Sequence, residues 1–104
     1  MPESGAIMKA VIIGGTSGLG GAIAGVFLSN GWNVAVTGRR GESIRDFSAR
    51  WPRSVARRME LSDLEGSRKT FMELAETLGG VDLVVVNAGS YENDPHADWA
   101  LEKR

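Results

Sequence analysis

Apolar and polar positions along this chain form blocks whose period changes in a regular order. Short apolar runs predict four β-strands, at 10–13, 33–37, 53–59 and 81–86. Apolar residues at helical spacing predict three helices between them, at 18–30, 42–51 and 63–78. Strands that alternate with helices are typical of βαβ units and a parallel α/β sheet.

The three predicted helices each have an apolar face. In the first, the expected buried residues are Leu19, Ala22, Ile23, Val26, Phe27 and Leu28. In the third, they are Leu64, Phe71, Leu74, Ala75 and Leu78, and Ser62 with Glu65 stands at the spacing of a capping box.

In a sheet of order 3-2-1-4, right-handed crossovers put the first two helices on one face and the third on the other. The valine-rich fourth strand would then lie at an open edge with apolar side chains exposed, so we expect association with a second copy.

Composition narrows the class of protein. The 104 residues suit one small domain, for which we expect an N-terminal extension over 1–8 and the folded domain over 9–104. Cysteine is absent, so neither disulfides nor a thiolate metal site is expected. The net charge is -1, and acidic residues interrupt the arginines between positions 39 and 58, which disfavours nucleic acid as a partner. No apolar run approaches the roughly 18 residues of a membrane span, so we expect a cytoplasmic protein.

A glycine-rich turn joins the first strand to the first helix. Such a turn presents backbone N–H groups at the positive end of a helix, where a phosphate or pyrophosphate can bind. Gly14 lets the chain leave the strand, Gly18 lets a ligand approach the backbone, and Gly20 lets the helix pack closely on the sheet. No Lys-Ser or Lys-Thr pair follows, which excludes a P-loop. The residues expected to form this cradle are Gly14, Gly15, Thr16, Ser17, Gly18, Leu19 and Gly20.

Two arginines follow the second predicted strand. In a dinucleotide-binding fold the adenosine ribose reaches this position, and an acidic residue there binds the 2′-hydroxyl of NAD. Neither Thr37 nor Gly38 is acidic. Arg39 and Arg40 instead offer permanently charged, planar donors that suit a 2′-phosphate. They predict a preference for NADP(H) over NAD(H), the alternative being a solvated pair at the tip of a loop.

The glycine spacing resembles that of the short-chain dehydrogenase/reductase superfamily, Thr-Gly-x-x-x-Gly-x-Gly, with Ile13 in place of the threonine. The replacement removes a side-chain hydrogen bond from the turn. The resemblance implies a Rossmann-type doubly wound sheet, here incomplete, with three to four helices; a fourth would begin near Asp94. It also implies that Glu60 and Leu61 contact the adenine, and that the residues after the fourth strand contact the ribose: Asn87, Ala88 and Gly89.

The superfamily's catalytic residues, a serine and a Tyr-x-x-x-Lys motif, have no counterpart in this sequence. Pro95 stands where the lysine would follow Tyr91. We therefore expect no catalytic residue in this chain, which would be inactive alone and would form the cofactor-binding part of an NADP(H)-dependent oxidoreductase acting on a small-molecule carbonyl or alcohol. Two alternatives remain: a non-enzymatic module that senses NADP(H), and a truncated product that binds poorly.

Overall fold

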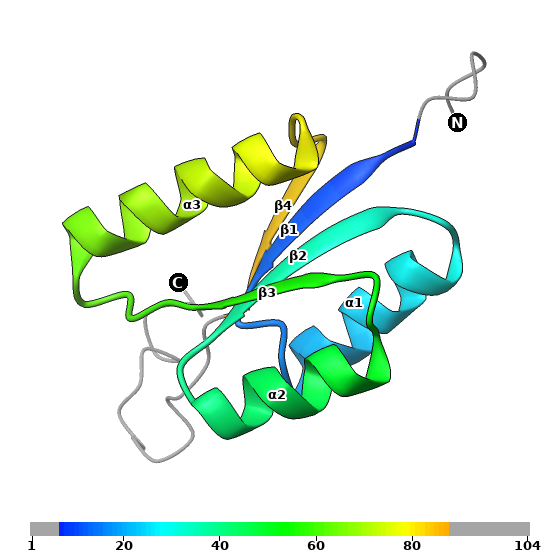
Figure 1. Cartoon of the computed structure of the whole chain (residues 1–104), viewed down its shortest axis with the longest axis horizontal. Coiled ribbons are helices and arrows are strands. Elements are labelled where there is room, and N and C mark those ends of the chain that lie inside the picture. Colours follow the sequence, from blue (N-terminus) through cyan, green and yellow to red (C-terminus); the bar gives the residue numbers. More distant parts are fainter. Residues whose placement is uncertain (1–6, 88–104) are drawn as a thin grey trace, which may run out of the picture.

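The computed structural model describes residues 7–87 and shows four parallel strands in one sheet, in the predicted order β3-β2-β1-β4 (Figure 1). Their bounds are β1 (Lys9–Ile13), β2 (Asn33–Gly38), β3 (Val55–Arg58) and β4 (Leu83–Val86). The central strand β1 pairs with β2 on one side and β4 on the other, so Ile12 lies between Val36 and Val85. Residues 10–12 of β1 are fully buried, as expected for a parallel strand covered on both faces.

Helices cover both faces of the sheet. The helices α1 (Gly18–Ser29) and α2 (Gly41–Arg50) lie on one side, and α3 (Leu64–Leu78) lies alone on the other (Figure 1). Because successive strand residues point to opposite faces, β1 contributes Ile12 to the core under α1 and α2, and Val11 to the core under α3. The predicted layering is therefore confirmed for the described residues.

The buried face of α1 differs from the prediction. Leu19 and Val26 are 67% and 61% exposed, and Ala22 is exposed as well. Leu28 is buried as predicted, but the fully covered line continues through Gly20 and Ala24, and the predicted residues Ile23 and Phe27 are half-buried beside it. Small residues at the line of contact let the helix axis approach the sheet. The small size of these side chains, rather than their hydrophobicity, therefore determines which face of α1 packs on the sheet.

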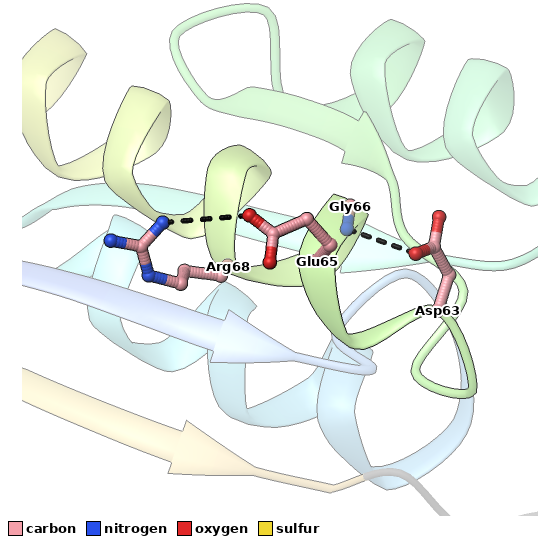
Figure 2. A network of polar contacts seen from close by, with 4 residues as sticks. All are labelled: Asp63, Glu65, Gly66 and Arg68. Atoms are coloured by element: carbon pink, nitrogen blue, oxygen red, sulfur yellow. Dashed lines mark hydrogen bonds and ion pairs between the residues drawn. The ribbon is translucent and has the colours of Figure 1, made fainter.

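The start of α3 also differs from the prediction. Asp63, not Ser62, is the N-cap residue, and its carboxylate accepts a hydrogen bond from the Gly66 amide at 3.0 Å (Figure 2). Ser62 instead donates to the Glu60 carboxylate. The helix therefore begins one residue later than a Ser62 cap requires. Leu64 becomes its first residue and is 78% exposed, whereas Leu74 and Leu78 are buried as predicted.

The fourth strand lies at an open edge, as predicted. Its apolar side chains Leu83, Val84 and Val86 are 37%, 44% and 68% exposed. Val84 and Val86 are on the face that α3 covers, since they pair in register with Val11 and Ile13. Association through this edge stays a prediction. Among residues 7–87, no helix has the length and apolar character needed to cross a bilayer.

Candidate nucleotide-binding site

The predicted site residues gather at one edge of the sheet. All strands are parallel, so the segments that follow them begin at the same edge. The glycine turn follows β1, Arg39 and Arg40 follow β2, and Glu60 is the second residue after β3. Asn87 follows β4 directly. The structure thus brings together every predicted site residue that it describes; Ala88, Gly89 and the helix expected near Asp94 lie outside the described residues.

The first two glycines of the turn face inward. Gly14 has φ +84°, and its amide donates to the Thr37 carbonyl at 3.0 Å and to the Thr37 Oγ1 at 3.2 Å. The Gly15 amide donates to the same carbonyl at 2.9 Å. These two N–H groups attach the turn to β2, and they are not free to meet an anion. The expectation that the turn directs its amides outward is therefore wrong for Gly14 and Gly15.

The second half of the turn is open. Ser17 is the N-cap residue of α1, and its side chain makes no capping hydrogen bond. Gly18 has φ +59°, and a Cβ built there would meet nothing within 4 Å. Within residues 7–87, the amides of Gly18, Leu19 and Gly20 have no backbone acceptor. The positive end of the α1 dipole thus coincides with unused donors and with backbone that leaves room for a ligand.

Gly20 lies where three segments meet. A Cβ on this residue would overlap the Gly14 carbonyl oxygen and would stand 2.9 Å from Asn87 Nδ2. Asn87 donates its side-chain amide to the same carbonyl at 3.5 Å and its backbone amide to the Ile13 carbonyl at 2.7 Å. Gly20 is therefore closely packed, as expected, and Asn87 links the end of β4 to the turn that follows β1.

Arg39 and Arg40 are exposed and immediately precede α2, whose N-cap residue is Arg40. Gly38 before them is buried, and a Cβ on it would overlap Thr16 Oγ1 and stand 2.8 Å from Thr16 Cγ2. The glycine turn therefore packs directly on the end of β2. Since Thr16 occupies the space beside Gly38, no acidic side chain fits there without displacing the turn.

The segment after β3 runs beside the end of β2. The Met59 amide donates to the Gly38 carbonyl at 2.9 Å, which extends the strand pairing by one bond. Glu60 is exposed, and its backbone carbonyl accepts from the Asp63 amide and from the Ser67 hydroxyl. Leu61 is 40% exposed. The two residues expected to contact adenine are therefore accessible at the same edge as the arginines.

The sequence analysis missed the role of Thr37. Thr37 is 1% exposed, and its hydroxyl supplies the turn with a side-chain acceptor from β2. Ile13, where the superfamily has threonine, belongs to the core under α3. The available signal was a threonine at the end of the run 34–37, whose other residues are apolar, because a buried hydroxyl needs a partner.

We expect Thr37→Val to lower the free energy of unfolding by about 0.5–1.5 kcal/mol, the usual net worth of one intramolecular hydrogen bond. Valine keeps the volume and branching of the side chain but removes the side-chain acceptor, so the Gly14 amide keeps only its bond to the backbone carbonyl of residue 37. Urea unfolding measures the change. Thr77→Val is the matched control, because Thr77 is exposed on α3 and bonds only within its own helix. Equal effects of the two substitutions would contradict the role assigned to the buried hydroxyl.

Comparison with known proteins places this arrangement among oxidoreductases. The family model described as short chain dehydrogenase matches residues 8–103. An uncharacterized oxidoreductase from Mycobacterium tuberculosis is 34% identical over 87 residues, which cover 78% of this chain and 34% of that protein. A serine 3-dehydrogenase from Rhizobium radiobacter is 37% identical over 82 residues, covering 76% of this chain and 32% of that protein. The chain thus spans about a third of the length of these relatives.

Solved structures agree with this relationship. The crystal structure of an actinorhodin polyketide ketoreductase with NADPH superposes with a TM-score of 0.76 at 26% identity. The match covers 80% of this chain and 33% of that one. Since the family model spans nearly the whole sequence and the sheet has the predicted order, the chain belongs to the short-chain dehydrogenase family.

Proposed function

We propose that this chain is the NADP(H)-binding part of a short-chain dehydrogenase that transfers hydride between the nicotinamide and a carbonyl or alcohol carbon. The second half of the glycine turn, 16–20, holds the pyrophosphate. Arg39 and Arg40 hold the 2′-phosphate, Glu60 and Leu61 border the adenine, and the segment from Asn87 onward borders the ribose.

The main support for the proposal is the exposed pair of arginines, Arg39 and Arg40, at the start of α2. Both guanidinium groups reach solvent, and the N-terminal end of the helix adds a partial positive charge at the same place. A 2′-phosphate carries two negative charges near neutral pH and accepts planar, bidentate hydrogen bonds from arginine. The position beside them, Gly38, is closed to an acidic side chain by Thr16. The site therefore favours NADP(H) and lacks the feature that would favour NAD(H).

The glycine turn fits the rest of the cofactor. Gly18 offers backbone without a side chain, and the first three amides of α1, which have no backbone acceptor within residues 7–87, lie at the sheet edge at which the strands end. The amides of Gly14 and Gly15 serve a different purpose, because they fix the turn to Thr37. The nicotinamide supplies the hydride chemistry when the cofactor is bound. The residues of this chain bind and orient it, and the groups that move a proton on the substrate are expected elsewhere in the protein.

Isothermal titration calorimetry with NADPH and NADH tests the proposal on the full chain. We expect NADPH to bind at least tenfold more tightly, which corresponds to about 1.4 kcal/mol. Arg39→Ala and Arg40→Ala should each reduce NADPH affinity about tenfold, because each removes a charge-assisted hydrogen bond to the phosphate. Neither should change the affinity for NADH.

Arg50→Ala is the charge-matched control, since Arg50 is exposed at the far end of α2. It should leave both affinities within about twofold of the parent chain. Equal affinity for NADPH and NADH would refute the assignment of the arginines. Failure to bind either cofactor would refute the dinucleotide site itself.

A further inference from the structure

Arg58, the last residue of β3, reaches across to the segment that carries the predicted phosphate ligands. Its Nε donates to the Arg39 backbone carbonyl at 3.0 Å. In the strand register Arg58 lies opposite Gly38, and the next amide, that of Met59, donates to the Gly38 carbonyl. The end of β3 therefore holds the chain at positions 38 and 39 by one side-chain and one backbone hydrogen bond.

The remainder of the Arg58 guanidinium is available for binding. Arginine has five N–H donors in a fixed plane, and the bond to Arg39 uses the one on Nε. Within residues 7–87 the terminal nitrogens of Arg58 have no acceptor, and the side chain is exposed. A third permanent positive charge thus lies next to Arg39 at the edge of the sheet where the parallel strands end.

Its neighbour Arg57 provides a contrast within the same strand. Val55 packs with the core under α3 and Ala56 with the core under α1 and α2, so the alternation of the strand puts Arg57 on the α3 face and Arg58 on the opposite face. Arg57 donates only to the adjacent Ala56 carbonyl, at 3.2 Å. The two arginines have equal charge and both are exposed, but within residues 7–87 only Arg58 bonds to the segment after β2.

We infer that Arg58 is a specificity-determining residue for the 2′-phosphate. It fixes the backbone of Arg39, and it presents its remaining donors to the same phosphate as Arg39 and Arg40. The inference rests on the proposed NADP(H) site and adds a residue from a different strand to it. A charged residue on an edge strand also discourages pairing with other chains. That role is sufficient to explain Arg57, whereas the bond from Arg58 to Arg39 indicates a further role.

Paired ligands isolate the phosphate contribution. Adenosine 2′,5′-bisphosphate and AMP differ only in the 2′-phosphate, so the ratio of their dissociation constants measures how well the protein holds that group. We expect Arg58→Ala to reduce this ratio about tenfold while the affinity for AMP stays within about twofold, since one charged hydrogen-bonding partner is lost. Arg57→Ala should leave the ratio within about twofold. Arg58→Lys should give an intermediate ratio, because lysine keeps the charge but not the planar set of donors.

The possible outcomes separate the two proposals. If the parent chain prefers the bisphosphate and Arg58→Ala keeps the full ratio, the inference about Arg58 fails and the NADP(H) site stands. Equal losses in Arg57→Ala and Arg58→Ala would also overturn the inference, because they would indicate a general effect of charge. If the parent chain shows no preference for the bisphosphate, the NADP(H) assignment fails and the inference fails with it. The AMP affinity reports folding in every variant.

Discussion

Leu74→Ala is expected to lower the free energy of unfolding by about 2–5 kcal/mol, the usual range for a large-to-small substitution in a core. Leu74 is fully buried on α3 and packs in the cluster that contains Val11, Ala35 and Met59. Only α3 covers this face of the sheet among the described elements, so no neighbouring helix can move in to fill the cavity. Small domains have about 5–15 kcal/mol of stability in total, and the substitution removes a large part of it.

Urea or thermal unfolding followed by circular dichroism measures this loss, and Met72→Ala is its control. Met72 lies two residues earlier on the same helix and is 57% exposed, so its truncation should change the free energy of unfolding by less than about 0.5 kcal/mol. In a domain of this size each kcal/mol lowers the melting temperature by roughly 4–8 °C. Similar melting temperatures for the two variants would show that α3 does not form the core described for it.

The order of the elements and the edge that carries the site could be predicted from the sequence because both depend on local signals. Apolar runs, helical spacing and the glycines at 14 and 31 mark where each element begins and ends. The resemblance to the short-chain dehydrogenases implies the strand order, right-handed connections then fix the face that each helix covers, and a parallel sheet brings the carboxyl ends of all strands to one edge. The location of the arginines after β2 and of Asn87 after β4 at this edge follows from that geometry without further information.

The orientation of α1 could not be predicted from hydrophobicity. Its sequence, GLGGAIAGVFLS, contains almost no polar residue that would mark the outer face. The choice between Leu19 and Gly20 as the inner residue depends on how closely the helix approaches the Gly14 carbonyl, which is a property of the folded turn. The large residues Leu19 and Val26 therefore remain outside despite their hydrophobicity.

The hydrogen bonds made at the ends of elements also could not be predicted, because they depend on the folded backbone. Ser62 and Asp63 are both good N-cap residues, and the turn in which the Asp63 amide donates to the Glu60 carbonyl selects Asp63. Arg58 has the sequence pattern of a charged edge residue, and its bond to Arg39 follows from the register of β3 against β2. These differences lie at the ends of elements, where a shift of one residue changes which groups face the site.

Gly20→Ala is expected to destabilise the protein by about 1–3 kcal/mol, the usual cost of inserting a methyl group into a closely packed site. Within a helix the same change ordinarily stabilises by about 1 kcal/mol, since alanine has the higher helix propensity. At Gly20 the new methyl group would overlap the Gly14 carbonyl oxygen, which is backbone and cannot rotate away. Relief requires α1 to move outward or the turn to open, and either movement breaks the contact between Asn87 and Gly14.

Gly21→Ala separates packing from propensity, because its added Cβ would stand 3.5 Å from the Thr16 carbonyl carbon, an ordinary contact distance. We expect this neighbouring variant to match or exceed the stability of the parent chain by up to about 1 kcal/mol. We also expect Gly20→Ala, but not Gly21→Ala, to weaken NADPH binding. The turn that Gly20→Ala displaces contacts both the start of α1, with its open amides, and the end of β4. Two variants of equal stability would mean that α1 does not approach the turn as closely as described, and the cradle built on that approach would lose its support.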